Sequence, residues 1–284
     1  MRVDEARGPV KLQAGVSFYW RCTASGGNTG CMYTPSKPIP GEFAGRRALV
    51  TGGSRGIGAA IAQQLLDEGA QVVTTARSRA ATTPEGSTFI PADLRSADAI
   101  TALVTEAAHT LGGLDLLVHN AGAARVHLEG SESIPDEEWQ DSLDIHFLSA
   151  IRLINAALPA LRKAENPAIV NISTNGTETP SGPLLHYVAA KAALDTYTKG
   201  IAQDLAKEGI RVNLVTPGPV DTLGGSAILQ TIAEGIGATR EALVAGVPLG
   251  RAGEPGDIAE AVTFLLSPRA QWITGTNIKV TGGS

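Results

Sequence analysis

The sequence predicts an α/β fold in which one parallel β-sheet of about seven strands has helices on both faces. Short segments rich in β-branched and other aliphatic residues alternate along the chain with longer amphipathic segments of helical periodicity. The composition agrees, because 43% of the 284 residues are hydrophobic but only 4% are aromatic. Such a balance is typical of an aliphatic sheet that is covered by helices.

Strands and helices alternate from Phe43 to the C-terminus. Strands are expected at 46–51, 71–76, 87–91, 114–119, 168–173, 210–215 and 276–280. Helices are expected at 57–68, 96–111, 135–163, 185–208 and 254–267. Right-handed crossovers between parallel strands would place these helices on both faces of the sheet. Residues 43–284 therefore form one domain, in which the apolar, glycine-interrupted segment at about 217–255 is expected to form a small helical lid over a substrate pocket.

Residues 1–42 differ from the rest of the chain. They lack strand or helix periodicity and contain a Gly/Ser/Asn/Thr cluster followed by a proline-rich stretch, so we expect a poorly ordered N-terminal extension. Met32 is the only methionine besides Met1, which leaves two interpretations open: a real flexible tail, or translation that starts at Met32. No secretory signal is visible, and a cytoplasmic location is expected.

Charge and composition argue against several classes of partner. The formal net charge is −5, which disfavours nucleic acid and anionic membranes, and no stretch approaches the roughly 20 apolar residues of a membrane helix. Both cysteines, Cys22 and Cys31, precede the predicted domain, which excludes a disulfide framework within it. No metal site is expected, because the five histidines follow no metal-ligand spacing; they are His109, His119, His127, His146 and His186.

A glycine-rich turn joins the first predicted strand to the first helix. Residues 51–58 read Thr-Gly-Gly-Ser-Arg-Gly-Ile-Gly. A helix that begins in such a turn presents free N–H groups and the positive end of its dipole, which suit a pyrophosphate. Glycine allows the unusual backbone angles and the close approach of a ligand. The turn predicts a dinucleotide site formed by Gly52, Ser54, Arg55, Gly56, Ile57 and Gly58.

Two arginines indicate which dinucleotide is bound. A cofactor with a free ribose 2′-hydroxyl favours an acidic residue at the end of the second strand, but Ala76 occupies that position. Arg55 lies in the turn and Arg77 directly follows the strand. Two guanidinium groups without a carboxylate suit a 2′-phosphate, so NADP(H) is favoured over NAD(H).

Tyr187 and Lys191 are four residues apart in a predicted helix and therefore share one face. A free tyrosine, with a pKa of about 10, is a weak base at neutral pH. A neighbouring ammonium group stabilises the phenolate and lowers that pKa. Tyr187 is therefore the candidate general acid/base that exchanges a proton with a substrate oxygen while hydride is transferred.

Taken together, these motifs resemble the short-chain dehydrogenase/reductase family. The resemblance runs from about Ala44 to the C-terminus, and its pattern is most similar to the 3-oxoacyl-acyl-carrier-protein reductase branch. It implies a Rossmann-like sheet and a homotetramer. The matching motifs are the turn at 51–58, Asp93-Leu94, Asn120-Ala121-Gly122, Tyr187-x-x-x-Lys191, Pro217-Gly218 and the segment from Ile273 to Gly283.

The resemblance also implies roles for residues around the cofactor. Asp93, with Leu94, would contact the adenine side, and Lys191 would hold the nicotinamide ribose. Asn120, Ala121 and Gly122 would stabilise the sheet beside the cofactor. The residues bordering the nicotinamide and pyrophosphate would be Pro217, Gly218, Val220 and Thr222.

Two positions depart from the family pattern. The catalytic hydroxyl usually belongs to a serine, whereas here Thr174 has that register and Ser173 precedes it. Either hydroxyl could stabilise developing negative charge on a substrate oxygen; we place Thr174 first and keep Ser173 in reserve. His146 stands where the family has an asparagine that helps hold a proton-relaying water. Its backbone carbonyl could fill that role, or it could be an ordinary helix histidine.

The sequence thus predicts an NADP-dependent oxidoreductase that transfers hydride between the cofactor and a carbonyl or secondary alcohol in a small-molecule substrate. Two alternatives stay open. One is a cofactor-binding sensor or scaffold without turnover, for which the changes at Thr174 and His146 speak. The other is an epimerase or dehydratase that uses the same site.

Overall fold

The computed structural model describes residues 41–284, so the predicted order of residues 1–40 and a start at Met32 lie outside the described part. The folded part includes two residues that we assigned to the extension. Gly41 accepts a hydrogen bond from the backbone of Ala44, and Glu42 forms an ion pair with Arg269 at 2.8 Å. These contacts fix the start of the domain against its C-terminal helix.

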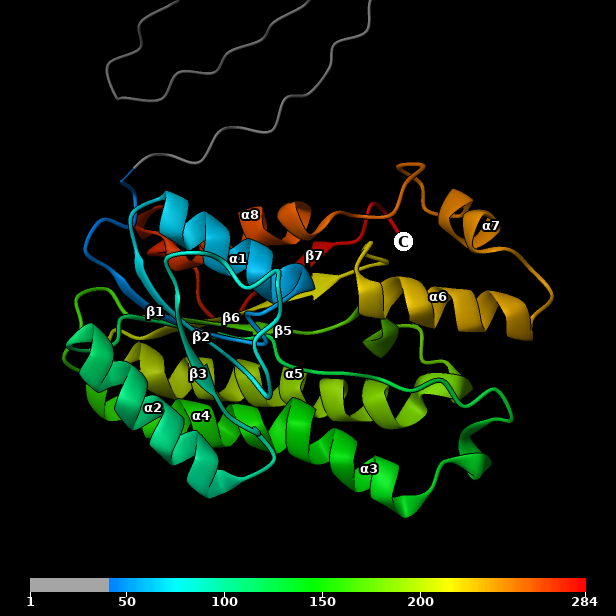
Figure 1. Ribbon diagram of the computed structural model, residues 1–284, viewed down its shortest axis with the longest axis horizontal. Coiled ribbons are helices and arrows are strands. Elements are labelled where there is room, and N and C mark those ends of the chain that lie inside the picture. Colours follow the sequence, from blue (N-terminus) through cyan, green and yellow to red (C-terminus); the bar gives the residue numbers. More distant parts are fainter. Residues whose placement is uncertain (1–40) are drawn as a thin grey trace, which may run out of the picture. The chain divides into compact units, whose positions relative to one another are not determined.

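One sheet of seven parallel strands runs through the domain (Figure 1). Its order is β3-β2-β1-β4-β5-β6-β7, so the direction of winding reverses between β1 and β4. At such a switch point the loops after the strands diverge and leave a crevice for a ligand. The strands are β1 (Arg47–Thr51), β2 (Gln71–Ala76), β3 (Thr88–Pro91), β4 (Leu116–His119), β5 (Ala168–Ile172), β6 (Arg211–Pro217) and β7 (Asn277–Val280).

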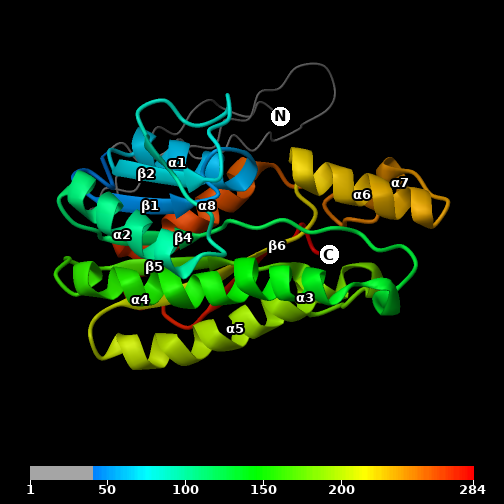
Figure 2. The ribbon, with the colours of Figure 1, turned by 60° about the horizontal axis from the view of Figure 1, so that its bottom comes forward.

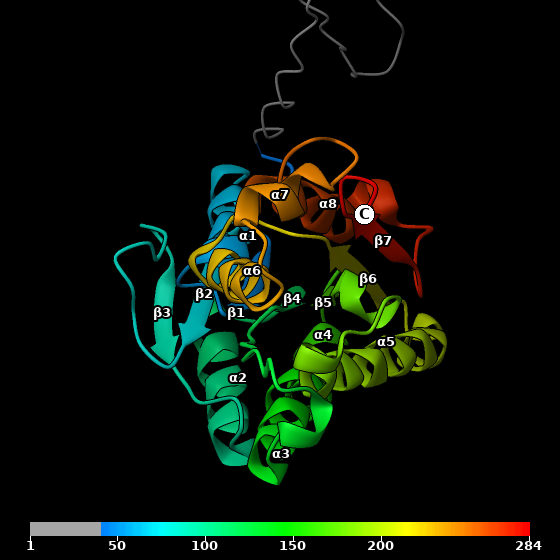
Figure 3. The same ribbon diagram turned by 90° about the vertical axis from the view of Figure 1, so that its right-hand side faces the viewer.

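Helices cover both faces of the sheet (Figures 1 and 3). On one face, α1 (Gly56–Asp67) and α8 (Pro255–Leu266) pack with the sheet into one apolar cluster. On the other face, α2 (Ala97–Leu111), α4 (Ser149–Leu161) and α5 (Leu185–Ala206) form the second cluster. The central strands β4, β5 and β6 are buried along their whole length, as a doubly covered parallel sheet requires.

The helix expected at 135–163 contains a change of pitch. It consists of α3 (Asp136–Leu143), a π-helical turn at Asp144–Leu148 and α4. The stretch Asp136–Leu161 is long and apolar enough to cross a membrane by length and composition alone. One face of it, with Leu153, Ile154 and Leu161, is fully buried in the second cluster, and 33% of its most apolar window is buried. Single π-turns often mark functional positions, and this one contains His146.

The segment between β6 and α8 forms two helices, α6 (Leu223–Gly235) and α7 (Arg240–Ala245). Figure 2 shows this pair at one end of the molecule, beyond the C-terminal ends of the strands. Leu223, Ile236 and Leu249 in and around it are 82%, 65% and 75% exposed. Short 3-10 helices complete the chain at Ser131–Ser133, Asn175–Thr177, Gly182–Leu184 and Pro268–Ala270.

The predicted fold class is confirmed. Each of the seven strands and five long helices is present, with ends that differ from the predicted ends by at most two residues. The π-turn was not predicted. A single wider turn inside a long helix leaves the apolar periodicity on either side of it recognisably helical.

Candidate active site

The turn at 52–55 leads from β1 directly into the N-terminus of α1. Arg55, the N-cap residue, makes no side-chain capping hydrogen bond, and the first turn contains no acidic residue. The first N–H groups of α1 are therefore available to an anion. A Cβ on Gly58 would lie 2.2 Å from the carbonyl oxygen of Gly52, so only glycine lets the helix approach the turn this closely. The backbone of Gly52 itself has a φ of 65°, which favours glycine.

Asn120, directly after β4, connects this turn to the sheet through hydrogen bonds. Its side-chain amide donates to the backbone oxygens of Thr51 at 3.1 Å and of Gly52 at 3.4 Å. The Thr51 hydroxyl in turn accepts from the backbone N–H groups of Asn120 and Ala121, at 3.0 and 3.1 Å. The two strands that flank the switch point are thus joined by side chains at their C-terminal ends.

The loop after β6 reaches the same place. Thr222 caps α6 by accepting from the N–H of Gly225, and its methyl group would lie 3.2 Å from a Cβ on Gly56. Gly218 packs against Thr281, where a Cβ would lie 2.8 Å from the Cα atom. Val220 is buried and forms a β-bridge with Gly253. The structure therefore brings Thr222 beside the glycine turn, whereas Gly218 and Val220 contact the segments at Thr281 and Gly253.

The predicted adenine side is a shallow cleft of ≈ 330 Å³ lined by Arg77, Pro91, Ala92 and Asp93. Arg55 and Arg77 are both exposed, and Arg77 is one of the residues that line this cleft. The Asp93 carboxylate pairs with Arg95 at 3.2 Å, whereas Leu94 is buried in the core. A larger groove of ≈ 540 Å³ between α5 and the loop at 274–275 contains none of the predicted site residues.

Tyr187 and Lys191 lie one turn apart in α5, beside the end of β5. Lys191 is 3% exposed, and its Nζ donates to the carbonyl oxygen of Ile172 at 2.6 Å. Burial lowers the pKa of Lys191 to about 8, against the opposing effect of Asp195. The ammonium group therefore remains mostly protonated at neutral pH.

The pKa of Tyr187 is shifted in the direction opposite to our expectation. Burial raises the pKa of the Tyr187 hydroxyl, a hydrogen bond with Thr174 lowers it, and the charge of Asp195 raises it. Lys191 does not acidify the phenol by itself, because the burial of the hydroxyl outweighs the groups that favour the phenolate. The protein alone therefore keeps Tyr187 protonated at neutral pH.

The two candidate hydroxyls after β5 point to different partners. Thr174 lies near enough to Tyr187 to lower the pKa of its hydroxyl, whereas the Oγ of Ser173 donates to Asp195 at 2.5 Å. Ser173 is only 4% exposed. Successive side chains of an extended segment face opposite ways, which separates these neighbours. Of the two, the structure places Thr174 beside Tyr187.

His146 lies against the Tyr187 ring, with ring centroids 4.9 Å apart and planes at 77°. Its Nε2 hydrogen-bonds the carbonyl oxygen of Ala123 at 2.8 Å, so it must be the protonated nitrogen. A Cβ on Gly122 would lie 2.4 Å from the imidazole. Burial, together with the charge of Lys191, moves the pKa of His146 well below its usual value. The histidine is therefore neutral, and it holds the loop after β4 against Tyr187.

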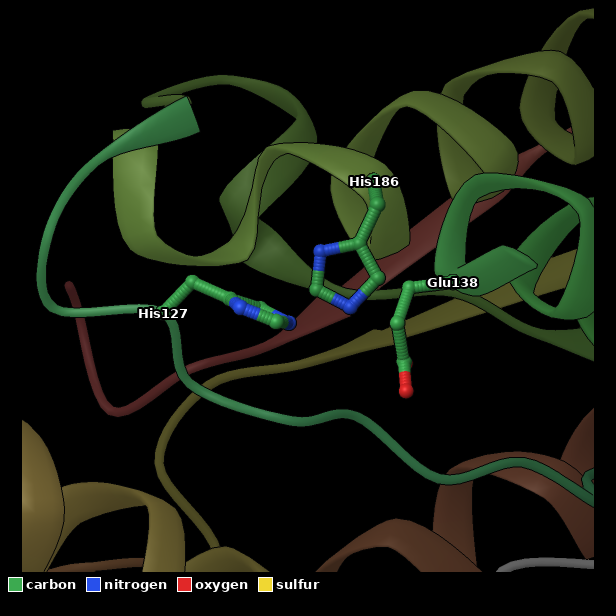
Figure 4. A group of neighbouring side chains, drawn as sticks. All are labelled: His127, Glu138 and His186. Carbon is green, nitrogen blue, oxygen red and sulfur yellow. The ribbon is translucent and has the colours of Figure 1, made fainter. Parts of the chain in front are cut away.

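Three further histidines lie close to this site, and sequence reasoning gave them no role. His119 is fully buried, with its Nε2 2.8 Å from the Oγ of Ser149. His127 and His186 come together with Glu138 (Figure 4). No local spacing could have found this group, because its members belong to the loop after β4, α3 and α5.

The chain is similar to known oxidoreductases over the whole described domain. A family model described as enoyl-(acyl carrier protein) reductase matches residues 52–284. The chain is 37% identical to 3-oxoacyl-acyl-carrier-protein reductase of Vibrio cholerae, over 84% of this chain and 97% of that protein. It is 35% identical to L-fucose dehydrogenase of Mus musculus, over 86% of this chain and 89% of that protein.

A solved structure agrees with these relatives. Aldohexose dehydrogenase of Thermoplasma acidophilum superposes with a TM-score of 0.78 at 29% identity, covering 86% of this chain and 95% of that chain. The family model, the relatives and the seven-stranded fold show that the chain belongs to the short-chain dehydrogenase/reductase family, whose oxidoreductases act on CH–OH or C=O groups with a nicotinamide cofactor.

Proposed function

We propose that the protein is an NADP(H)-dependent reductase of ketones, or dehydrogenase of secondary alcohols, with Tyr187 as the general acid/base. The observation that supports this most directly is that Thr174 lies near enough to Tyr187 to lower the pKa of its hydroxyl, while Lys191, one helical turn further along α5, donates from Nζ to the carbonyl oxygen of Ile172 at the end of β5. A phenol, a second hydroxyl and an ammonium group thereby gather at the C-terminal edge of the sheet, where ligands of such folds bind.

The residues present fit a dinucleotide. The uncapped N-terminus of α1 would take the pyrophosphate, with the backbone of Gly52 and Gly56 close to it. The cleft beside Asp93 would take the adenosine end, and the exposed guanidinium groups of Arg55 and Arg77 would bind a 2′-phosphate. The nicotinamide end of the dinucleotide would be bordered by Pro217, Gly218, Val220 and Thr222. Lys191 would hold the ribose of that end.

The chemistry of the side chains follows from their protonation. The bound cofactor supplies or accepts the hydride. In the reductive direction, Thr174 donates a hydrogen bond to the substrate carbonyl oxygen and stabilises the negative charge that develops there. Tyr187, which its raised pKa keeps protonated, donates its proton to that oxygen. The hydrogen bond from Lys191 to the carbonyl oxygen of Ile172 holds the ammonium group at the end of β5.

The lid favours a substrate with an apolar part. Leu223, Ile236 and Leu249 present large aliphatic side chains to solvent around α6 and α7. Among the relatives, one reduces 3-oxoacyl groups and others oxidise sugars, so the chemistry of the substrate's carbonyl or alcohol is shared while its remainder differs. We propose a small or medium-sized ketone, or the corresponding alcohol, with an aliphatic substituent.

Consumption of NADPH in the presence of a panel of ketones and acyl thioesters tests this function, with NADH run in parallel. We expect turnover of at least one ketone and faster reaction with NADPH than with NADH. Binding of NADPH without its oxidation across the panel would support the sensor alternative. A product of unchanged oxidation state would support an epimerase or dehydratase.

We also propose that the protein is cytoplasmic and assembles into a homotetramer. Trp272 is 98% exposed in the single chain, which is unusual for so large an aromatic side chain and is explained if another subunit covers it. Light scattering of the purified protein measures the assembly directly, and a monomeric mass at micromolar concentration would contradict it.

A further inference from the structure

His127, Glu138 and His186 form a cluster of potential metal ligands beside the site described above. One nitrogen of each histidine and one oxygen of the carboxylate all lie within 4.8 Å of one another. The two imidazole rings are turned toward each other, with centroids 5.3 Å apart and planes at 88° (Figure 4). None of the three residues has a role in the proposed hydride transfer.

The cluster holds buried nitrogen atoms that the fold leaves without partners. His186 is 1% exposed. Within residues 41–284, neither Nδ1 of His186 nor Nε2 of His127 has a hydrogen-bond partner, although both atoms are inaccessible to solvent. In Figure 4 the unpaired Nε2 of His127 faces the other two side chains, whereas the Nδ1 of His186 lies on the side of its ring away from Glu138. Because a buried nitrogen without a partner is unfavourable, the Nε2 of His127 calls for a ligand within the cluster.

We propose that His127, Glu138 and His186 bind a divalent zinc ion. Two imidazoles and one carboxylate are a ligand set that zinc accepts, with water in the fourth position. The nitrogen donors also favour zinc over magnesium, which prefers oxygen ligands in an octahedral arrangement. Tetrahedral donors around zinc lie about 3.4 Å apart, so binding requires the three side chains to close by roughly 1 Å. This site revises our expectation that the chain has none.

A charged neighbour competes for the same carboxylate. Arg125 forms an ion pair with Glu138, and its side chain is 78% exposed. A guanidinium group so exposed can leave the carboxylate at little cost, because ion pairs of exposed side chains contribute little to stability. Removing Arg125 should therefore strengthen zinc binding, whereas removing a ligand should weaken it.

The ion would connect three separate parts of the chain. The backbone N–H of His127 donates to the carbonyl oxygen of Pro183, which already ties the loop after β4 to the segment before α5. The next residue, Leu128, contacts Gly235 in the lid helix α6, where an added Cβ would lie 2.5 Å from the leucine side chain. Zinc would thus fix the loop on which α6 rests.

Equilibrium dialysis against Zn²⁺ at pH 7.5, followed by metal analysis, tests the site. All proteins should be the full chain with Cys22→Ser and Cys31→Ser, because cysteine thiols would bind zinc independently. We expect one bound equivalent in this parent protein. We expect an affinity reduced by about tenfold or more in His127→Ala, since even loss of an outer-shell partner costs 10–100-fold.

Two matched variants sharpen the test. His109→Ala removes an exposed histidine of α2 and should leave zinc affinity unchanged. Arg125→Ala should raise the affinity. The visible spectrum of bound Co²⁺ gives a second readout: four-coordinate bands should be present in the parent protein and absent in His127→Ala. Circular dichroism checks that each variant is folded.

The proposal is overturned if the parent binds no zinc at micromolar concentrations, or if folded His127→Ala binds zinc as tightly as the parent. Equal losses in His127→Ala and His109→Ala would also overturn it, because they would indicate unspecific binding to histidines. Since dialysis does not depend on turnover, a failure here leaves the proposed reductase activity untouched.

Discussion

The two halves of the proposed site are built by different physics. The cofactor half, around β1, α1 and the end of β4, is formed by backbone atoms packed closely against glycines, as at Gly52 and Gly58. The substrate half, around β5 and α5, is formed by buried ionisable side chains such as His146 and Lys191. The structure of the cofactor half depends on close packing against glycines, whereas the chemistry of the substrate half depends on the protonation states of its side chains. Changes of volume should therefore damage the first, and changes of pH or of a hydroxyl should damage the second.

His119, the last residue of β4, provides the largest expected effect, because its side chain is a buried ionisable group like those of the substrate half. Burial lowers the pKa of His119 to about 3, whereas the unfolded chain has a value near 6.5. Because the unfolded state then binds more protons between these values, the stabilisation is complete above pH 6.5 and is lost as the pH falls to 3. His119→Asn should reduce this loss by up to about 5 kcal/mol. Urea unfolding at several pH values measures it.

The exposed His109 is the matched control for this prediction. His109→Asn should leave the pH dependence of the unfolding free energy unchanged. If His119→Asn and the wild type lose stability in parallel between pH 6.5 and 3, His119 does not titrate with the depressed pKa that its burial implies.

Thr174 and Ser173 give the next largest effect. Because Thr174 lies near enough to Tyr187 to lower its pKa, Thr174→Ala should lower kcat by about 10²-fold, whereas Thr174→Ser should recover most of the loss. Ser173 bonds Asp195, so Ser173→Ala should change kcat by less than about tenfold. Steady-state kinetics with the best ketone of the panel would measure this, and the reverse order of effects would assign the catalytic hydroxyl to Ser173.

In the cofactor half, Gly58→Ala should be the most damaging small change. A methyl group 2.2 Å from the carbonyl oxygen of Gly52 forces the helix away from the turn, and such overpacking costs about 1–3 kcal/mol. NADPH affinity should fall together with the free energy of unfolding. Calorimetric titration and urea unfolding measure the two quantities.

Gly200 in α5 offers the opposite case. A Cβ there meets no atom within 4 Å, so Gly200→Ala should stabilise the protein by about 0.5–1 kcal/mol through helix propensity. If both glycine variants behave alike, close packing is not what makes Gly58 necessary.

The smallest expected effect concerns cofactor choice. Arg77→Ala should weaken NADPH binding by about tenfold and leave NADH binding unchanged, because only the former has a 2′-phosphate. Arg79, which is also exposed and two residues away, is the control: Arg79→Ala should change neither. Fluorescence titration with both cofactors measures the four affinities, and a parallel loss for NADPH and NADH would speak against a phosphate contact.

The fold and the cofactor turn could be predicted because their causes are local in the sequence. Short aliphatic segments define β1 to β7, period-3.6 patterns define the long helices, and the glycines of the turn lie within seven residues of one another. The register implied by the family resemblance named Thr174 first and kept Ser173 in reserve, so the choice of the catalytic hydroxyl stays a prediction.

The electrostatics of the substrate half could not be predicted in the same way. The spacing of Tyr187 and Lys191 indicates a shared helix face, but the direction of the Tyr187 pKa depends on how much surrounding chain buries its hydroxyl. The contact of His146 with Tyr187 arises from a π-turn that the periodicity does not report. The convergence of His127, Glu138 and His186 likewise depends on how three elements pack.

The most direct measurement of the central claim is single-turnover oxidation of bound NADPH by a ketone substrate, comparing the wild type with Tyr187→Phe. This change removes the proton donor but keeps an aromatic ring against His146. We expect the rate to fall by about 10²–10⁴-fold while the affinity for NADPH stays the same. A variant that binds NADPH normally and oxidises it at the wild-type rate would contradict the assignment of Tyr187 as the acid.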